Sequence, residues 1–468
     1  MADEAQFVPT KRGGESLIYR EFKFRLNRKG RDGKRHWKCI VETCRANAVT
    51  DRANSVIKVG EHNHLSNPAK LTAEKIVRGI KRRAFEEVVP IPRIYQEEVA
   101  NSAEQGILSD DVSVYLPNFI GCHTAAYSHR RKQMPLLPAL REDIILEGQW
   151  RQTADGGDFL IANDGDIDKL IIFGSVESLM KVAIADTVFM DGTFYIAPNI
   201  FTQLYTVHAK IYGQIFPLLY GLLPDKRQAT YERFIRLISD KIREVNENVA
   251  FNPNTIVVDY EMSALQACRG ELPGAQLKGC RFHFGQAIHR SVQRLGLAAQ
   301  YRDADNMDPI RKWIRRTLAL PLVPLDRLDE VWMTTMNEAP AILQAAAFND
   351  YVTANWIDDM DARFDRTLWN HYDRLDQPRT INAVEGWHHK INTYTGHAHP
   401  NLYELVRFLK REEMFQRSEI QRLEAGGRPK PRRATYVRVD ERMLRLKEQY
   451  VNGERDIMSY VDAISYLV

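Results

Sequence analysis

The fold of this chain is decided by two short runs of sequence, VFMDGTF at residues 188–194 and IVVDYE at residues 256–261. In each run, strand-forming apolar residues end on an aspartate. A short continuous apolar run predicts a buried strand, and an acid at its end costs free energy unless it is paired or bound to metal. Asp191 and Asp259 are therefore predicted to come together and hold a divalent metal ion.

The segments around these runs predict the rest of the sheet. Residues 202–211 and 215–223 have the pattern of two further strands, 229–247 forms an amphipathic helix, and 255–259 returns as a strand. The order β-β-β-α-β-α is that of a ribonuclease H-like fold, which places acids from its first and fourth strands side by side. We predict an α/β core of this type, a mixed five-stranded sheet with helices, flanked by short strands at 159–161 and 170–173 and interrupted by an all-helical insertion.

Chemistry on a phosphodiester explains why such a core needs acids. Two divalent ions about 3.5–4 Å apart activate an attacking water and stabilise the leaving oxygen, and Mg²⁺ or Mn²⁺ prefers carboxylate ligands. The candidate third acid is Glu385, in the helix that follows Pro378. Asn382 and Glu385 also have the spacing of a capping box, so their position alone leaves the catalytic and structural interpretations equal.

Residues 7–66 predict a small β-rich domain, in which Asp32-Gly33 supplies a hairpin turn. Two thiolates and two imidazoles make a common tetrahedral zinc set, and metal binding would supply folding energy that so short a segment lacks. The two histidines are separated by one residue, which predicts that both rings project from one side of an extended strand. The predicted zinc ligands are Cys39, Cys44, His62 and His64.

Composition limits the class of protein. The 468 residues carry a net charge of +4, but residues 1–70 hold 15 Lys and Arg against 8 Asp and Glu. A second basic cluster lies at 428–433, and such patches on a near-neutral chain fit a polyanion partner or, equally, a solvated face. Five scattered cysteines indicate a reducing compartment. Neither a signal peptide nor a membrane-spanning run of about 20 apolar residues is recognisable, which predicts a soluble intracellular protein.

Helical patterns dominate the region between the small domain and the core. A helix with a cap at Thr72 carries Ile76, Ile80 and Ala84 on one stripe, and further helices are expected at 93–104 and 119–132. These helices form either a second DNA-binding unit of helix-turn-helix type or a structural bridge. Towards the C-terminus, an amphipathic helix is expected at 402–423. A basic linker or DNA-contacting arm follows it, and the last helix packs on the core or on another subunit.

Two resemblances assign functions to these motifs. The aromatic strands, Trp37-x-Cys39, the Cys39-x4-Cys44 pair and the His62-x-His64 pair resemble FLYWCH-type zinc fingers and, more broadly, the WRKY and GCM fingers. This resemblance implies binding to duplex DNA, although a module for protein contacts is the alternative. It places basic residues on phosphates or base edges: Arg25, Arg28, Lys29, Arg31, Lys34 and Arg35.

The second resemblance covers roughly residues 170–400. The runs DGTF at 191–194, CRFH at 280–283 and NAVEGWH at 382–388, with Asp259 between the first two, are similar to a Mutator-like element (MULE) transposase. That family implies a DDE triad of Asp191, Asp259 and Glu385, with Glu261 a poorer candidate that starts the next helix. It also implies a helical insertion that helps to hold DNA, although its tryptophans are expected to serve packing.

The resemblance leaves the role of Cys280 and His283 open. A second zinc site with His289 or Cys268, contact with DNA, and simple packing are the alternatives for these residues.

The predicted organisation divides the chain into six parts. Residues 1–68 form the zinc finger, 69–140 the helical linker or second DNA-binding region, and 141–283 the first part of the catalytic core. The helical insertion follows at 284–377, the last part of the core with the third acid at 378–424, and the basic linker and final helix at 425–468.

The function implied is that of a nuclear DDE transposase. It would bind terminal inverted repeats and target DNA as a dimer or larger homo-oligomer, away from any membrane, and cleave and join strands with two Mg²⁺ or Mn²⁺ ions and a structural Zn²⁺. The alternative is a domesticated relative that regulates transcription by binding DNA without cleaving it. A nuclease without strand transfer is the third hypothesis.

Overall fold

The computed structural model describes residues 5–10, 14–87, 89–132, 134–303 and 308–468, with the side chain of residue 303 left aside. The chain divides into two compact units, Met1–Leu136 and Leu137–Val468. The division falls between Pro135 and Pro138. The finer boundaries expected from the sequence remain predictions.

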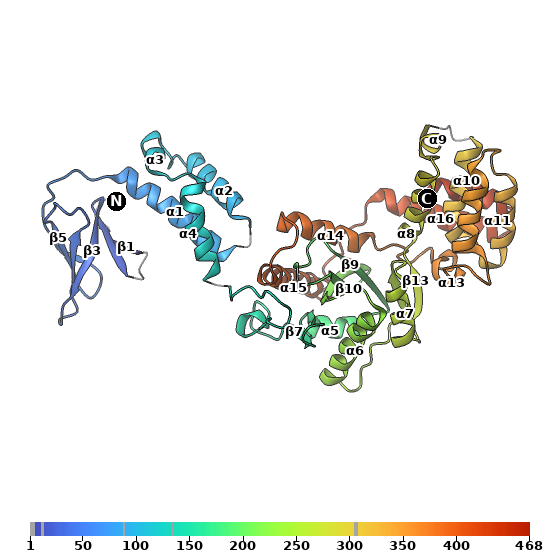
Figure 1. Ribbon diagram of the computed structural model, residues 1–468, viewed down its shortest axis with the longest axis horizontal. Helices are drawn as coiled ribbons and strands as arrows, with labels where there is room; N and C mark the ends of the chain where they lie inside the picture. The colour runs from blue at the N-terminus through green and yellow to red at the C-terminus, as the bar shows by residue number, and fades with distance from the viewer. Residues whose placement is uncertain (1–4, 11–13, 88, 133, 304–307) are drawn as a thin grey trace. The chain divides into compact units, whose positions relative to one another are not determined.

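The first unit begins with a six-stranded antiparallel meander. Each strand pairs with the next one along the chain, as Figure 1 shows in blue. The strands are β1 (Gln6–Pro9), β2 (Glu15–Tyr19), β3 (Phe22–Lys29), β4 (Arg35–Cys39), β5 (Asn47–Thr50) and β6 (Val56–Val59). Gly33 adopts a φ of 81° in the turn between β3 and β4, which confirms the predicted hairpin. Its small core contains Leu17, Phe24 and Trp37.

Four helices complete this unit: α1 (Pro68–Glu86), α2 (Ile91–Glu104), α3 (Asp110–Tyr115) and α4 (Phe119–Arg131). Ile76, Ile80 and Ala84 are buried, as their spacing predicted. The predicted cap at Thr72 was wrong, because α1 begins one turn earlier, where the Asn67 side chain accepts a hydrogen bond from the Lys70 N–H at 2.8 Å. Asn67 followed by Pro68 is the stronger start signal.

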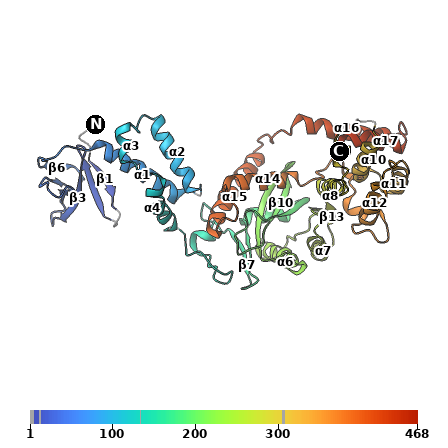
Figure 2. The same ribbon diagram turned by 45° about the horizontal axis from the view of Figure 1, so that its top comes forward.

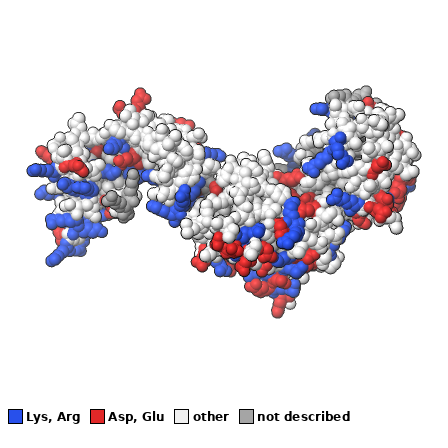
Figure 3. Space-filling view, viewed as in Figure 1, with Lys and Arg blue, Asp and Glu red and all other residues white. Residues whose placement is uncertain are grey.

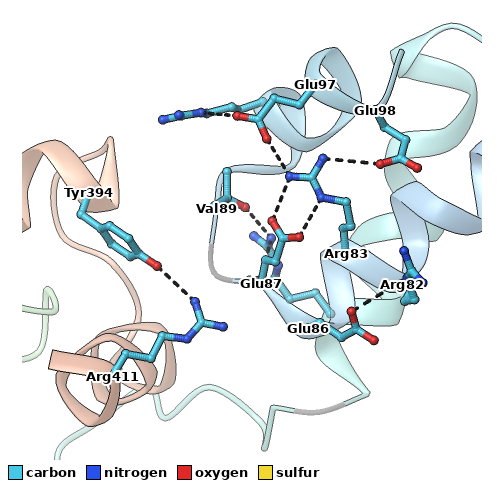
Figure 4. Close-up of polar contacts among 11 residues, drawn as sticks. Arg82, Arg83, Glu86, Glu87, Val89, Glu97, Glu98, Tyr394 and Arg411 are labelled. Atoms are coloured by element: carbon cyan, nitrogen blue, oxygen red, sulfur yellow. Dashed lines mark hydrogen bonds and ion pairs between the residues drawn. The ribbon is translucent and has the colours of Figure 1, made fainter. Parts of the chain in front are cut away.

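One arginine joins the first two helices of this unit. The guanidinium of Arg83 lies among three carboxylates (Figure 4), at 2.7 Å from Glu87 and 2.6 Å from Glu97, with Glu98 at 3.5 Å. The Arg83 side chain is 16% exposed, so water competes weakly for these bonds. We infer that this ion-pair hub fixes the angle between α1 and α2.

We predict that Arg83→Met weakens the packing of α1 on α2 by about 1–2 kcal/mol, because it leaves three acids without their common partner. Hydrogen exchange of the full chain should show faster exchange of α2 amides. Arg82→Met is the control, since Arg82 lies on the exposed side of the same turn and approaches Glu86 only at 3.9 Å. Equal exchange rates in the two variants would contradict the hub.

The second unit is built on a seven-stranded mixed sheet, with the strand order β13-β12-β9-β10-β11-β8-β7. The strands are β7 (Leu160–Asp164), β8 (Leu170–Phe173), β9 (Thr187–Thr193), β10 (Gln203–Ile211), β11 (Gln214–Leu223), β12 (Thr255–Val258) and β13 (Gln276–Gly279). The strands from β9 to β7 pair antiparallel, whereas β12 and β13 run parallel to β9. The sheet has more strands than the five that were predicted. The two short strands expected to flank it, β7 and β8, belong to the sheet and form one of its edges.

Helices cover both faces of this sheet (Figures 1 and 2). On one side lie α5 (Val176–Ala183), α6 (Gln228–Val245) and α7 (Met262–Glu271), and on the other α14 (Asn382–Thr395) and α15 (Leu402–Glu424). Side chains alternate along a strand, so Phe189 and Val257 share the α14 face while their neighbours face α5 and α6. Asp191, two residues after Phe189 in β9, therefore also belongs to the α14 face.

A helical layer is inserted between β13 and α14. It comprises α8 (Arg281–Arg294), α9 (Ala298–Asp303), α10 (Pro309–Ala319), α11 (Leu328–Asn337), α12 (Gln344–Val352) and α13 (Arg366–Trp369). Trp313, Trp332 and Trp356 are at most 2% exposed, which confirms that they serve packing.

The C-terminal helices pack against this insertion. They are α16 (Ala434–Val451) and α17 (Ile457–Ile464). The Tyr460 hydroxyl donates to the Leu322 carbonyl at 2.7 Å, and Asp462 pairs with Arg316 at 2.5 Å. The end of the described chain thus closes on its own insertion. No helix in the described ranges is long and apolar enough to cross a membrane.

Candidate functional site

The four predicted zinc ligands meet at one point of the first unit. Cys39 Sγ lies 3.3 Å from His64 Nε2, Cys44 Sγ lies 3.4 Å from His62 Nδ1, and the two ring nitrogens are 3.2 Å apart. A tetrahedral zinc ion with ordinary bond lengths separates such ligand atoms by about 3.3–3.8 Å. Among the described residues, this is the one group of three or more His, Cys or acidic side chains whose ligand atoms lie within 4.8 Å of one another.

Groups around this set support the liganding atoms. The backbone N–H groups of Val41 and Ala46 each point to a cysteine sulfur at 3.4 Å, which stabilises thiolate charge. The His64 Nδ1–H donates to the Leu65 carbonyl at 2.9 Å, which leaves Nε2 unprotonated for metal. The Phe22 ring stacks on His62 with centroids 3.7 Å apart. The donor set and its surroundings fit structural Zn²⁺.

The predicted strand for the two histidines was wrong. His62 and His64 follow the last strand in a segment without regular structure. Their rings converge because one offers Nδ1 and the other Nε2, and because the Asn63 side chain between them bonds the Thr43 carbonyl at 3.2 Å. The conformation of this loop, and not the alternation of side chains along a strand, therefore brings the two histidine rings together.

Basic residues gather on this finger (Figure 3). Arg25, Arg28, Lys29, Arg31 and Lys34 are exposed on β3 and the following turn. Arg35 differs: it pairs with Glu15 at 2.7 Å and lies over the rings of Phe7 and Trp37 at 4.6 and 5.2 Å. The Arg35 guanidinium is therefore engaged within the finger, and DNA contact by all six basic residues remains a prediction.

The two strand acids lie where parallel strands meet. Asp191 is inside β9, two residues before the strand ends, and Asp259 directly follows β12, the neighbour of β9. Asp191 is 8% exposed and accepts a hydrogen bond from the Gly192 N–H at 2.9 Å. Burial beside a second acid makes this position costly for a charged group without a counter-charge.

Glu385 returns to these aspartates from the other side of the insertion. It lies in the first turn of α14, and its charge is felt by Asp191. The start of α14 is held by β13 and α8: the Ile381 N–H donates to Cys280 Sγ at 3.3 Å, and the Arg281 N–H donates to the Arg379 carbonyl at 2.9 Å. The third acid therefore returns to the neighbourhood of Asp191.

The capping-box interpretation of Glu385 is wrong. Ile381 is the N-cap of α14, and no side chain makes a cap hydrogen bond there. Asn382, the predicted cap, is instead the first residue of the helix. The Glu385 side chain is left to face His283, whose Nε2 lies 3.4 Å from Glu385 Oε1.

Burial raises the pKa of all three acids. The pKa of Asp191 reaches about 8, with the charges of Asp259 and Glu385 adding to the effect of burial. Burial likewise raises the pKa of Asp259 and of Glu385. Raised pKa values at clustered carboxylates mark a candidate functional site. Among the described residues, the oxygens of these three acids do not form a set within 4.8 Å of one another.

Histidines line the buried side of this acidic cluster. His388, three residues after Glu385 on α14, lies 3.5 Å from Asp191 Oδ2 and 3.4 Å from Thr206 Oγ1. Burial lowers the pKa of His388 to about 4, so the ring is neutral at pH 7 and its contact with Asp191 is not an ion pair. Sequence reasoning missed this residue, although its spacing from Glu385 puts both on one helix face.

A second zinc site around Cys280 does not form. Within the described residues, Cys280 joins no metal-ligand group; it is fully buried and receives the Ile381 N–H. His283 faces Glu385 and acts electrostatically on Asp259. The Cys-x2-His segment therefore docks α14 through its cysteine and lines the acidic cluster through its histidine.

Comparison with known families agrees with this geometry. Residues 187–287 match the MULE transposase domain, and residues 7–64 match the FLYWCH zinc finger domain. No curated protein matches the chain. The chain therefore carries an N-terminal FLYWCH zinc finger and a MULE transposase domain, as its motifs predicted. The two domains support a transposase-derived DNA-binding protein. The matched residues include Asp191 and Asp259, whereas Glu385 lies beyond them.

We predict that Cys39→Ser removes zinc and unfolds the finger, because the small core of β1–β6 loses the metal that completes it. Zinc content should fall by one ion per chain, and amide protection of β3 and β4 should be lost. Cys122→Ser is the control: this buried thiol on α4 is outside the metal set and should leave zinc content unchanged. A folded, zinc-free Cys39→Ser finger would contradict the assignment.

We also predict that Asp191 contributes a loss of stability to the protein without Mg²⁺ as pH rises from about 4 to about 8. Folded Asp191 keeps its proton up to about pH 8, whereas an unfolded aspartate loses it near pH 4, so unfolding releases a proton within this window. Asp191→Asn should remove this dependence and raise the melting temperature at pH 8 by a few degrees.

Thermal unfolding between pH 5 and pH 8 measures both effects. Asp240→Asn, on the exposed side of α6, should follow the wild-type curve. Parallel curves for wild type and Asp191→Asn would mean that Asp191 ionises normally in the folded protein.

Proposed function

We propose that this protein is a DDE transposase, which binds transposon terminal inverted repeats through its finger and cleaves and joins DNA at Asp191, Asp259 and Glu385. The observation that carries the proposal is the return of Glu385, across the helical insertion, to the buried Asp191, whose strand is adjacent to the one that Asp259 follows. The MULE transposase match to the region of the first two acids supports the same function.

The topology supports a ribonuclease H-like core. Strands β9, β10 and β11 form an antiparallel meander, and β12 and β13 continue the sheet in parallel on the other side of β9. This is the order proposed from the sequence, with the first and fourth strands adjacent. A helix carrying the third acid then covers the face to which Asp191 points.

In this proposal the three carboxylates hold two Mg²⁺ or Mn²⁺ ions, which would activate the attacking group and stabilise the leaving oxygen. The carboxylates suit such hard cations. Asp191 and Asp259 are oriented by backbone N–H groups, of Gly192 at 2.9 Å and of Glu261 at 3.1 Å. Cys280 positions Glu385 by holding the first turn of α14.

The proposed sequence of reactions needs no covalent enzyme–DNA intermediate. Water attacks a phosphodiester at the element end and leaves a 3′-hydroxyl, and this hydroxyl then attacks a phosphodiester of target DNA. Cleavage at two transposon ends requires a dimer or larger homo-oligomer. Action on chromosomal DNA requires a nuclear location. A domesticated transcription regulator that binds DNA without cleavage is the alternative, which the FLYWCH match alone would satisfy.

We predict that Asp191→Asn and Glu385→Gln each reduce Mg²⁺-dependent DNA cleavage at least about 100-fold, because each removes a charged ligand of the two metal ions. DNA affinity should change less than about threefold, since the finger is untouched. Nicking of labelled duplex containing repeat ends measures the first, and fluorescence anisotropy the second.

Glu419→Gln provides the control on an exposed part of α15 and should cleave as wild type does. Wild-type cleavage by Glu385→Gln would remove this residue from the triad. Binding by the wild type with no cleavage in Mg²⁺ or Mn²⁺ would favour the regulator.

A further inference from the structure

A lysine outside the proposed triad is held at the edge of the acidic cluster. Lys226 lies in the loop between β11 and α6, and its ammonium pairs with Glu261 Oε2 at 2.6 Å. It also lies 4.4 Å from the centre of the Phe194 ring, a cation–π contact. The Lys226 side chain is 39% exposed, so its charge still reaches solvent. An acid and an aromatic ring thus fix a cation that remains accessible.

The anchor of this lysine is itself fixed. Glu261 is the N-cap of α7, yet its side chain makes no cap hydrogen bond. Its second oxygen, Oε1, accepts the Tyr231 hydroxyl at 2.8 Å, and the Gln203 amide donates to Tyr231 at 2.7 Å. Gln203 is 1% exposed. A buried chain of hydrogen bonds therefore orients the carboxylate that holds Lys226.

This chain of hydrogen bonds ends beside Asp191. A Cβ atom on Gly192 would lie 2.4 Å from Gln203 Oε1, so the residue after Asp191 has to be glycine for Gln203 to pack there. Phe194 is three residues beyond Asp191, and Glu261 is two beyond Asp259. The positive charge of Lys226 favours the ionised forms of both aspartates and so lowers their pKa values against the effect of burial.

A lysine positioned in this way can help the acidic cluster to bind DNA. The three acids repel a phosphodiester, and an ammonium beside them offsets that repulsion. Lysine carries three N–H donors, and Glu261 uses one. A lysine already ordered by neighbours loses little conformational entropy on binding a phosphate oxygen, unlike an ordinary surface lysine.

Resting on the proposed function, we propose that Lys226 binds one phosphate of the DNA strand at the acidic cluster, with Glu261 and Phe194 holding it in position. The ligand class is a DNA phosphodiester next to the one that is cleaved. Neutralisation of the aspartates alone is the competing role, and it involves no contact with DNA.

A scan of single neutral phosphates separates these roles. The probe is a 30-bp duplex selected from a random library by the full chain, and its affinity is measured in Ca²⁺. Lys226→Gln should bind it about 5–10-fold more weakly, with a salt dependence reduced by about one charge. One methylphosphonate position should weaken the wild type by the same factor and leave Lys226→Gln unaffected. Lys226→Arg should restore most of the affinity.

Lys241→Gln is the matched control, since Lys241 is also ion-paired, with Glu244 at 2.7 Å, but lies in the last turns of α6. It should behave as wild type. If every methylphosphonate weakens Lys226→Gln as much as the wild type, Lys226 contacts no phosphate and the inference is wrong. Because binding in Ca²⁺ needs no cleavage, absence of cleavage by the wild type in Mg²⁺ would overturn the proposed function separately.

Discussion

The placement of the buried Asp191 beside the half-buried Asp259 and Glu385 is the constraint on which the second unit depends. Asp191 and Asp259 stand on adjacent strands, and Glu385 joins them from a helix that begins after the whole insertion. Burial raises the pKa of each acid, and the charges of Asp259 and Glu385 raise the pKa of Asp191 further, so this arrangement costs free energy in the absence of cations. A ligand bound by the acids would offset this unfavourable free energy.

The surroundings of the acids resist this repulsion. Behind Asp191, Thr206 and the neutral ring of His388 occupy the buried side of the cluster. At the start of α14, the sulfur of Cys280 receives the Ile381 N–H and keeps the helix against the sheet. Within α14 and α15, Trp387 and Lys390 both bond the buried Glu412, and the Arg411 guanidinium bonds the Tyr394 hydroxyl (Figure 4). Helix α14 is thus tied at both ends.

Much of this architecture was predictable from local pattern. The apolar runs around Asp191 and Asp259, the zinc ligands and the hairpin at Gly33 each have a signal within a few residues, and those predictions held. The cap of α1 and the strand at His62 failed because a neighbouring residue offered a competing bond, from Asn67 in one case and Asn63 in the other. The contacts of His388 with Thr206 and of Lys226 with Glu261 could not be predicted, since they join residues far apart in the sequence. That Glu385 is catalytic remains a prediction.

In the proposed function, Asp191, Asp259 and Glu385 together hold two divalent ions. Anomalous scattering from crystals of the full chain with bound DNA and Mn²⁺ tests it most directly, and the zinc ion of the finger provides an internal reference peak. The account predicts two manganese peaks about 3.5–4 Å apart, contacted by Asp191, Asp259 and Glu385. A clear zinc peak with no manganese at the acids, or with Glu385 turned away from it, would contradict the account.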